Sequence, residues 1–418
     1  MKSLSNEVGE NLLNQRDASP ITARPELAYF AFSFLSSLNT GAYLVLVSWT
    51  ATELSGDASL AGALFFLSLI FGLISANVAG VTSDRSDPRN VLLAANLIRL
   101  IGSAILFIAF SNSAQIIAGL VAFTIMRAVG GVFIGTAGVN IFQMIFSKEV
   151  RTRKVAEVSI CNQIGIASGS GLAGIFLVQF GAFWLSAILA FFTVIQTPLI
   201  FLFTTRALLR NSSRSCPQKE KRDLFFDWRQ GFRYVVRNRR IGVSLVVMAA
   251  AFSVAQLTNT LVPSFVMNDL KMNSSSYGAL EASWAEGGTL VLLFVRRLSG
   301  SASSHRSELT FLGLTGVVMV LFALNRTIEI AFVLYFVLGA LFSITRTLAN
   351  GHLMTETENG VVGRVAAIGQ LLTNLIGAGI FSLPWFISTS TVTNVYVSWG
   401  AVMLTITAVT LVLSRRRV

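Results

Sequence analysis

The sequence predicts an all-α membrane protein with twelve transmembrane helices arranged as two bundles of six. Of its 418 residues, 53% are hydrophobic and only 12% are charged, which is about half the charged share of a soluble protein. Twelve apolar runs approach the roughly 20 residues that cross a bilayer. The basic residues stand between these runs and concentrate on one side of the membrane, as the positive-inside rule requires.

The twelve runs form two groups, separated by a polar interval. The first group is expected at 27–50, 58–82, 90–110, 115–140, 155–178 and 182–204. The second group is expected at 241–264, 277–295, 308–325, 328–350, 365–388 and 392–413. The weakest predictions are the eighth run, which contains Glu281 and Glu286, and the short junction near Asn325–Thr327.

The distribution of basic residues fixes the expected topology. With a cytoplasmic N-terminus, the outside loops hold only Lys271 and Arg326 of the 32 Lys and Arg residues, and three more lie inside helices. All the others fall in cytoplasmic segments, and one missed helix would have destroyed this asymmetry. The sequence therefore predicts a multi-pass protein of the inner (plasma) membrane with both termini in the cytoplasm.

The same reasoning divides the chain into five parts. Residues 1–26 are polar and resemble no signal peptide, so we expect a cytoplasmic tail. The bundles are expected at 27–204 and 241–414, and 415–418 form a second short tail. Between the bundles, 205–240 is a basic cytoplasmic linker. Its second part places apolar residues on one helical stripe and arginines mostly off it, which is typical of an amphipathic helix at a membrane surface. The stripe residues are Leu224, Phe225, Trp228, Phe232, Val235 and Val236.

The loop between the second and third runs reads Gly-Val-Thr-Ser-Asp-Arg-Ser-Asp-Pro-Arg, from Gly80 to Arg89. Gly80 permits a tight exit from the second helix, and Asp84 can cap a helix start. Arg85 and Arg89 can form charge pairs that exist in only one conformational state. The loop resembles the signature of the major facilitator superfamily, in the branch of enterobactin and macrolide exporters. The resemblance implies the major facilitator fold and a gating role for this loop on the cytoplasmic side.

Other segments resemble the same family, in the same order along the chain. Arg127 with Gly131 is similar to its intramembrane arginine motif, and Asp-Trp-Arg-Gln-Gly at 227–231 is similar to the stretch before its seventh helix. Gly-Arg-Val at 363–365 is similar to the start of its eleventh helix. In the family's antiporters the fifth helix is rich in glycine and carries a Gly-Pro step, and this motif marks export. The fifth run here shares the glycines but has Ser170 in place of that proline. The resemblance therefore suggests export through the glycines alone.

The glycines of the fifth run also admit a simpler interpretation. Small residues let transmembrane helices approach closely, so these glycines are expected to serve helix packing whatever the direction of transport. They are Gly165, Gly169, Gly171 and Gly174.

Charged residues inside the apolar runs are the candidates for proton coupling or substrate binding. A charge at the middle of a membrane helix costs roughly 2.5–3.5 kcal/mol on insertion scales, so it usually lines a cavity or has a partner. Glu286, near the centre of the eighth run, is the expected proton carrier or substrate ligand, and a structural salt bridge is its alternative. Glu281 lies about 140° round the helix and is expected at the outer interface. The remaining candidates are Arg99, Arg127 and Arg346.

Several chemistries receive no support from the sequence. Cys161 and Cys216 define neither a disulfide framework nor a metal site, and His305 and His352 lack metal-ligand spacing. No phosphate-binding loop is found, so direct ATP drive, enzymatic activity and a cofactor are not expected. Basic residues that lie mostly between the apolar runs argue against nucleic acid as a partner. Asn39 stands in the first run, near where many proton-driven relatives carry an acid, so the coupling ion stays open.

We therefore expect a monomeric secondary transporter whose bundles rock about a central site. The leading hypothesis is proton-coupled export of a small amphipathic molecule, a siderophore or drug-like compound, because 32 Phe residues favour an apolar cavity surface. The alternatives are an uptake permease for a polar metabolite and, with less support, a non-transporting membrane sensor or scaffold. The lipid bilayer and the small-molecule substrate are the expected partners.

Overall fold

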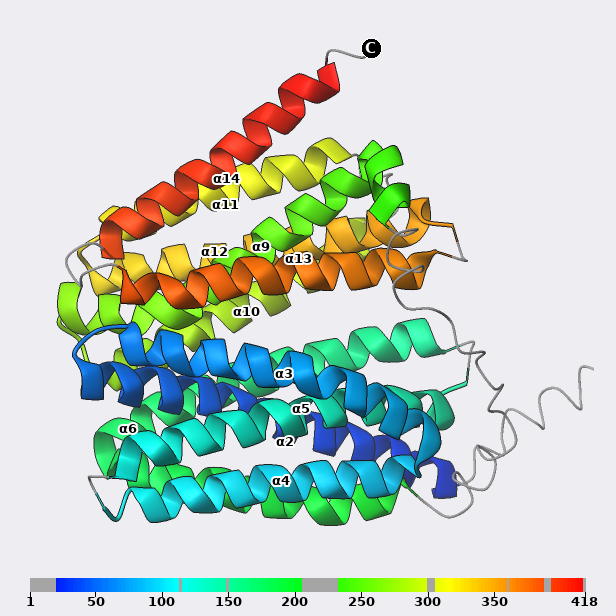
Figure 1. Ribbon diagram of the computed structural model, residues 1–418, viewed down its shortest axis with the longest axis vertical. Helices are drawn as coiled ribbons and strands as arrows, with labels where there is room; N and C mark the ends of the chain where they lie inside the picture. The colour runs from blue at the N-terminus through cyan, green and yellow to red at the C-terminus, as the bar shows by residue number, and fades with distance from the viewer. Residues whose placement is uncertain are drawn as a thin grey trace, which may run out of the picture.

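A computed structural model describes residues 20–112, 115–147, 150–204, 232–298, 305–358, 361–386 and 392–415, and these are almost entirely helical. Figure 1 shows two stacks of roughly parallel helices, one from each half of the chain, lying side by side. The all-α fold with two bundles is confirmed.

The N-terminal bundle contains five helical elements that make six membrane crossings, because the last element is broken into two. They are α2 (Pro20–Ser55), α3 (Ser59–Arg85), α4 (Pro88–Ala109), α5 (Ile116–Ile145) and α6 (Arg151–Phe203). The long α6 is broken at Gly181, where φ is +76° and ψ is 172°. Because glycine adopts positive φ without steric cost, this residue separates the expected fifth and sixth crossings.

The C-terminal bundle supplies the other six crossings. They are α9 (Arg239–Ser264), α10 (Ser274–Leu298), α11 (His305–Leu324), α12 (Ile328–Glu356), α13 (Val362–Ser382) and α14 (Val392–Arg415). Two short elements extend α9 and α13, namely η2 (Phe265–Asp269) and η3 (Leu383–Trp385). Ten described helices, α6 counted once, are long and apolar enough to span a membrane, and α10 is not among them. The expected weakness of the eighth run is therefore confirmed, since α10 carries two glutamates.

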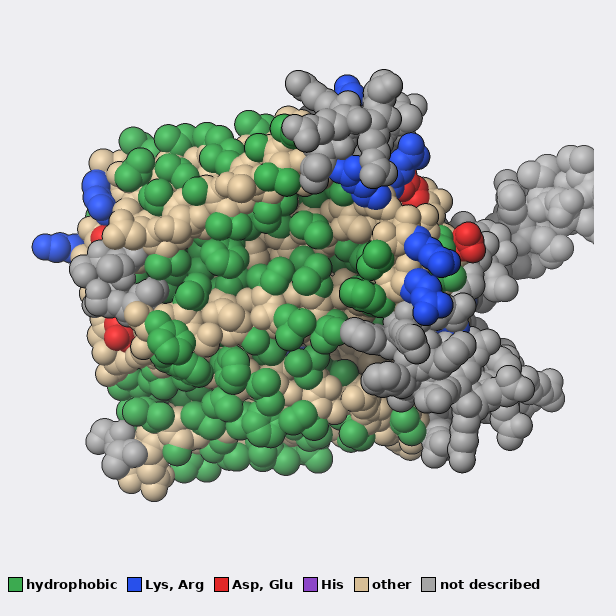
Figure 2. Space-filling view, turned by 45° about the horizontal axis from the view of Figure 1, so that its top comes forward, with side chains coloured by type: hydrophobic (Ala, Val, Ile, Leu, Met, Phe, Trp, Pro, Cys, Tyr) green, Lys and Arg blue, Asp and Glu red, His purple; other side chains and the backbone are tan. Residues whose placement is uncertain are grey.

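The surface agrees with a lipid environment. Figure 2 shows hydrophobic side chains over the middle of the molecule, with Lys and Arg at the two ends and more of them at one end than at the other. Large apolar residues such as Ile74, Phe191 and Val333 are at least 60% exposed on these helices. Exposed apolar surface of this extent would be unfavourable in water and is stabilised by lipid.

Two expectations about the loop at 80–89 are wrong in detail. Helix α3 continues to Arg85, so Gly80 lies inside the helix and not at its exit. The cap of α4 is Asp87, whose Oδ1 accepts a hydrogen bond from the Arg89 backbone N–H at 2.9 Å. The reason is Pro88, which occupies the first turn of α4 and sets the helix start one residue after Asp87.

The linker is described only from 232 onward, so the predicted stripe residues Leu224, Phe225 and Trp228 lie outside the described residues. Residues 232–237 form a short helix before α9. Its Phe232 and Val236 are exposed, as an interfacial stripe requires, whereas Tyr234 and Val235 pack on the C-terminal bundle.

Candidate functional site

The hydrogen bonds and ring contacts between the two bundles cluster at one end of the molecule. We call this the closed end, and it holds the α2–α3 connection, η2 and η3. The opposite end, which we call the basic end, holds the α3–α4 and α12–α13 connections and the start of α9. At the closed end the rings of Trp49 and Tyr277 stack across the bundles with centroids 6.1 Å apart, and Phe66 meets Trp385 at 5.6 Å.

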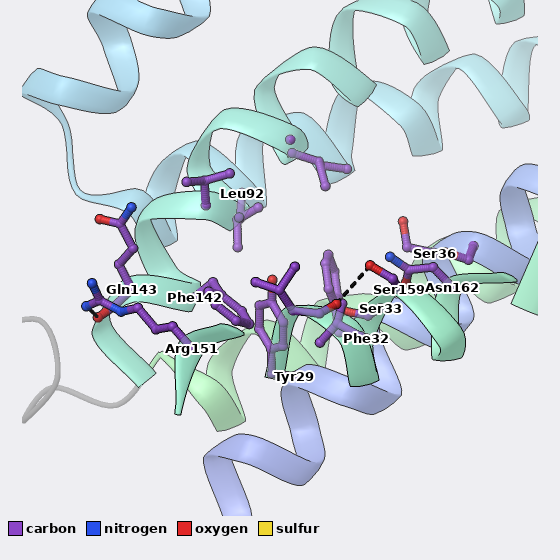
Figure 3. A pocket seen from close by; sticks show the side chains of 17 residues that line it. Tyr29, Phe32, Ser33, Ser36, Leu92, Phe142, Gln143, Arg151, Ser159 and Asn162 are labelled. Atoms are coloured by element: carbon purple, nitrogen blue, oxygen red, sulfur yellow. Dashed lines mark hydrogen bonds between the residues drawn. The ribbon is translucent and has the colours of Figure 1, made fainter. Parts of the chain in front are cut away.

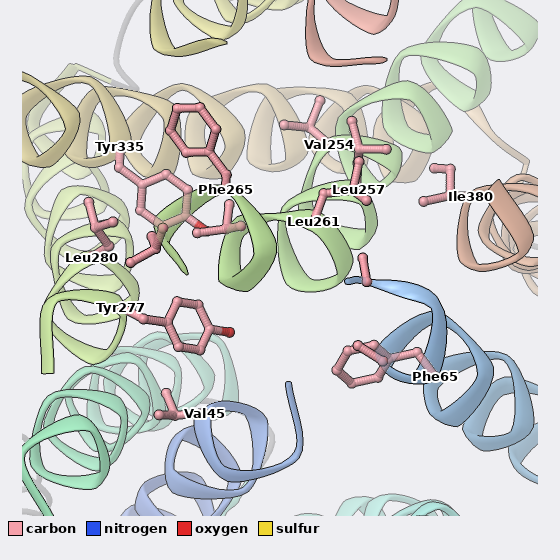
Figure 4. Packing of buried hydrophobic residues seen from close by; sticks show 14 of the residues in the cluster. Val45, Phe65, Val254, Leu257, Leu261, Phe265, Tyr277, Leu280, Tyr335 and Ile380 are labelled. Carbon is pink, nitrogen blue, oxygen red and sulfur yellow. The ribbon is translucent and has the colours of Figure 1, made fainter. Parts of the chain in front are cut away.

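Polar and glycine contacts reinforce the closed end. Asn268 Nδ2 donates to the Gly56 carbonyl at 3.3 Å, and Trp385 Nε1 donates to the Ser59 carbonyl at 3.3 Å. A Cβ added to Gly174 of α6 would lie 2.6 Å from the Ser274 carbonyl oxygen of α10, so the two backbones touch. The buried cluster in Figure 4 runs through this region, with Val45 and Phe65 from one bundle beside Tyr277 and Ile380 from the other.

The fifth-run glycines thus serve two different contacts. Gly165 and Gly169 pack against α2 within the N-terminal bundle, where an added Cβ on Gly165 would lie 2.8 Å from the Phe34 carbonyl. Gly174 instead packs across the gap on Gly278. Close packing, the simpler interpretation of these residues, is therefore what the structure contains.

A pocket of about 490 Å³ lies in the basic half, between α2, α5 and α6 of the N-terminal bundle. Figure 3 shows its two ends: Gln143 and Arg151 lie at one, and Ser36, Ser159 and Asn162 lie at the other. Between them the lining is aromatic and aliphatic. It includes Tyr29, Phe32, Phe142, Val139 and Val155. The pocket is therefore amphipathic, apolar along its walls and rich in hydroxyl and amide groups at its inner end.

Arg127 of α5 lies beyond that inner end and is 7% exposed. Its Nη1 donates to Asn39 Oδ1 at 2.8 Å, and its Nη2 donates to Thr40 Oγ1 at 3.0 Å. The Tyr43 ring lies under the guanidinium at 4.7 Å. Asn39 is oriented by α6, since its Nδ2 donates to the Leu189 carbonyl and to a threonine hydroxyl, each at 3.0 Å. Asn39, which stands near where the family resemblance implies an acid, is therefore a neutral hydrogen-bond partner of Arg127.

Arg99 of α4 is the second buried cation of this bundle, at 3% exposure. Its Nη1 donates to Ser36 Oγ at 3.3 Å. Among the described residues, its Nε and Nη2 have no hydrogen-bond partner. Arg99 and Arg127 are thus brought together around the same stretch of α2, as neighbouring like charges.

In the C-terminal bundle the structure reverses the expected burial of the two glutamates. Glu281 was expected at the interface, but it is 7% exposed and accepts a hydrogen bond from Tyr335 Oη at 2.8 Å. It lies one turn after Tyr277, the ring that contacts Trp49 at the closed end. The physical reason is that this face of α10 packs on α12 and towards the bundle boundary.

Glu286 was expected to be desolvated in a central cavity, and its side chain is exposed. It shares its side of α10 with Leu290 and Leu293, which are 46% and 45% exposed. The two leucines, about one and two turns further on, identify this as the outward apolar side of the helix. The expectation of burial is therefore wrong for Glu286.

The other predicted residues are distributed as follows. Arg346 of α12 is half-buried beside the Phe342 and Phe252 rings, at 5.6 and 5.9 Å. Arg89 lies over the Phe201 ring at 4.2 Å. The side chains of Asp84 and Arg85 lie outside the described residues. An added Cβ on Gly80 would meet no atom within 4 Å, so this face of α3 is open.

Sequence reasoning missed one buried cluster near the basic end of the C-terminal bundle. Glu308 of α11 is 0% exposed, accepts from Ser244 Oγ of α9 at 3.0 Å and lies 3.2 Å from His352 Nδ1 of α12. The cluster ties three helices together. The available signal was the placement of Glu308 directly before Leu309, at the first residue of an expected membrane helix.

Cys161 is a free thiol that donates to the Phe30 carbonyl at 3.7 Å, and Cys216 lies outside the described residues. Within the part of the chain that the structure describes, no group of three potential metal ligands is found.

Comparison with known proteins agrees with this arrangement. A search of curated protein sequences found no match. Among solved structures, the chain is similar to a mutant form of the nucleoside transporter NupG, with 15% identity, a TM-score of 0.69, and coverage of 92% of this chain and 99% of that one. It is also similar to a bacterial homologue of the iron transporter ferroportin in the inward-facing state, with 14% identity, a TM-score of 0.69, and coverage of 92% and 98%. Identities this low establish the fold alone.

The family comparison goes further, because it covers most of the chain. The model of the Major Facilitator Superfamily matches residues 29–382, a range that begins in α2, ends at the last residue of α13 and covers all of the bundle helices except the start of α2 and α14. The chain therefore belongs to the major facilitator superfamily and is a multi-pass membrane transporter.

Proposed function

We propose that the protein exports a small amphipathic organic molecule, a siderophore or drug-like compound, across the inner membrane in exchange for protons. The observation that carries this proposal is the asymmetry of the bundle contacts. The bundles meet through Trp49, Tyr277 and Trp385 at the closed end, whereas an amphipathic pocket lies in the basic half. The positive-inside rule places the basic end in the cytoplasm, so the pocket would load from that side.

The pocket lining supports the substrate class. Aromatic and aliphatic walls such as Phe32, Phe142 and Val139 favour an apolar body, and Ser36 and Asn162 offer hydrogen bonds to a polar group. The Oδ1 atom of Asn162 is buried without a hydrogen-bond partner among the described residues. A buried unsatisfied acceptor costs about 1–3 kcal/mol, and a ligand that donates a hydrogen bond there would recover part of that.

Glu281 replaces Glu286 as the proposed proton carrier. An ionised carboxylate in the buried cluster with Tyr335 is unfavourable, so proton binding would stabilise the arrangement in which the closed end is shut. Proton loss would favour opening there, because opening admits water to Glu281. Since Tyr277 lies one turn from Glu281 and contacts Trp49 across the bundles, the carboxyl group stands beside the gate that it would control.

A second candidate is uptake of a polar metabolite. Its support is the similarity to a nucleoside transporter together with the hydroxyl groups of Ser33, Ser36 and Ser37 in the pocket. Sequence resemblance to exporters and the apolar walls favour the first candidate, and the two predict opposite directions of coupled proton movement.

The test uses purified protein in liposomes that enclose the pH-sensitive dye pyranine. Amphipathic aromatic compounds, uridine and a sugar are added outside in turn, and the dye reports coupled proton movement. Export by exchange predicts that an amphipathic compound drives protons in the direction opposite to its own movement. Co-movement driven by uridine would support the uptake permease. No compound-dependent proton movement above that of protein-free liposomes would contradict both.

A further inference from the structure

In its described part, the N-terminal bundle buries two cations and no acid. Arg99 and Arg127 are 3% and 7% exposed. The acidic side chains described on or beside the helices of this bundle, which are Glu26, Glu53, Asp57, Asp87 and Glu157, are all exposed or half-buried. An unpaired charge in a low-dielectric interior is costly. The described part of this bundle therefore lacks a counter-charge for its two guanidiniums.

The hydrogen bonds of the two arginines are all to neutral groups. Arg127 donates to the Asn39 amide oxygen and the Thr40 hydroxyl, at 2.8 and 3.0 Å. Arg99 donates to the Ser36 hydroxyl at 3.3 Å, and its Nε and Nη2 have no partner among the described residues. Both guanidiniums carry a positive charge and bind the same stretch of α2, so like charges lie close together there. The two arginines therefore bring more hydrogen-bond donors and more positive charge than the described groups around them balance.

The pocket leads towards these donors. Ser36 lines the pocket and is the partner of Arg99, and Thr40, one turn further along α2, is the partner of Arg127. On α5, Gly131 and Gly135 follow Arg127 by one and two turns, and an added Cβ at either would meet no atom within 4 Å. No atom therefore crowds α5 at these two positions, of which Gly135 lines the pocket and Gly131 lies one turn closer to Arg127.

We propose that the inner end of this pocket binds an anionic group, a carboxylate, sulfonate or phosphate, held by Arg99 and Arg127. The planar guanidinium fork binds such groups through two parallel charge-assisted hydrogen bonds. The anionic group belongs either to the transported molecule or to a small inorganic anion. In the first case, which rests on the proposed function, the substrate is an amphipathic anion whose apolar body occupies the walls around Phe32 and Val139.

The first experiment measures the charge preference of the pocket without requiring transport. Ser36→Cys and Val139→Cys are made in a background with Cys161→Ser and Cys216→Ser. Each introduced thiol reacts with two methanethiosulfonate reagents, one ending in a sulfonate and one in a trimethylammonium group. The proposal predicts that Ser36→Cys favours the sulfonate reagent by about tenfold relative to Val139→Cys, because two nearby positive charges attract it.

Removing the charges should remove the preference. Arg99→Gln and Arg127→Gln should each lower the ratio at position 36 about threefold or more. As a safeguard against loss of the fold in these variants, Thr40→Asp supplies a carboxylate beside Arg127 and keeps both arginines, with Thr40→Asn as its neutral control. Thr40→Asp should lower the preference and Thr40→Asn should not. An equal ratio at positions 36 and 139, or a ratio that Thr40→Asp leaves unchanged, would overturn the proposal.

The second experiment tests occupancy and identifies the source of the anion. Modification of Ser36→Cys is timed with 2-naphthalenesulfonate, its neutral sulfonamide, or inorganic phosphate present. Protection by naphthalenesulfonate above that by the sulfonamide supports an organic anion, and protection by phosphate as well supports a general anion site. Equal slowing by naphthalenesulfonate and sulfonamide, with none by phosphate, would overturn it. Since neither readout involves proton movement, failure here is distinguishable from failure of proton-coupled export.

Discussion

The two bundles have the same number of crossings but bury charges of opposite sign. The N-terminal bundle buries Arg99 and Arg127, and the C-terminal bundle buries Glu281 and Glu308. In the first, the position facing Arg127 is the neutral Asn39, and in the second, the buried acids are held by tyrosine, serine and histidine. The difference suggests a division of labour, in which one bundle receives an anionic ligand and the other carries the proton.

The two buried acids also differ from one another in place. Glu281 lies near the contact of Trp49 with Tyr277 at the closed end, where the bundles separate during alternating access. Glu308 lies at the start of α11, inside one bundle, and joins three helices of that bundle. We therefore expect Glu281 to affect transport and Glu308 to affect stability.

The largest expected effect is that of Glu281→Gln on coupling. The amide mimics the protonated acid and keeps a hydrogen-bond acceptor for Tyr335, so folding and insertion should be preserved. Compound-driven proton movement in pyranine liposomes should fall to the level of protein-free liposomes. Glu286→Gln is the matched control on the exposed side of α10 and should resemble the parent. Loss of coupling in Glu286→Gln with parent-like Glu281→Gln would restore the assignment made from the sequence alone.

Glu308→Ala should destabilise the protein by about 1–3 kcal/mol, because two buried polar groups lose a hydrogen-bond partner. Ser244 and His352 would both lose an acceptor. Chemical unfolding of the purified protein in detergent measures the effect. Glu329→Ala, which removes an exposed acid from the first turn of α12, serves as the control and should change stability little. Equal effects of the two substitutions would contradict a structural role for Glu308.

Substitutions at the glycine contacts should distinguish an effect on stability from an effect on gating. Gly165→Val should cost about 1–3 kcal/mol of stability, because it overpacks a contact inside one bundle. Gly174→Val overpacks the contact between bundles and should instead open the closed end. A cysteine at Ser48, which is fully buried there, should then react faster with a thiol reagent in Gly174→Val than in Gly165→Val. Similar rates would show that the α6–α10 contact is not part of the gate.

The smallest effects are expected in the loop between α3 and α4. Asp87→Ala removes the cap of α4 and should cost about 1 kcal/mol of stability. Asp84→Asn and Arg85→Ala should leave stability unchanged and reduce transport, if the loop acts on gating as the family resemblance implies. Unfolding curves and pyranine assays on the same preparations separate the two effects. Normal transport by both loop variants would make this motif a family marker without a role here.

The fold could be predicted from the sequence because a membrane-spanning helix requires only a sufficiently long run of apolar residues along the chain. Runs of apolar residues and the placement of Lys and Arg identified all twelve crossings, including the division of α6 at Gly181 and the weak α10. Helix ends were less predictable, since α2 and α12 extend several residues beyond their apolar cores. Hydropathy carries no information on those extensions.

The site was less predictable because burial depends on which helices become neighbours. The 140° between Glu281 and Glu286 was evident from the sequence, but not which side of α10 faces inward. Leu290 and Leu293, on the side of Glu286, were an available signal for the outward side. The contact of Arg127 with Asn39 joins residues 88 positions apart, and helix periodicity does not reveal such a pairing.

Control of the closed end by the charge of Glu281 is open to direct measurement. Spin labels on Leu54 and Met272 measure the separation of the bundles there, and labels on Val139 and Met354 measure it at the basic end, by pulsed electron resonance. At acidic pH we expect a short distance at the closed end and a long one at the basic end, and a shift towards the reverse at alkaline pH. Glu281→Gln should keep the acidic-pH distances at both pH values, while Glu286→Gln follows the parent. Distances that do not change with pH, or that change with pH equally in Glu281→Gln and the parent, would contradict control of the closed end by Glu281.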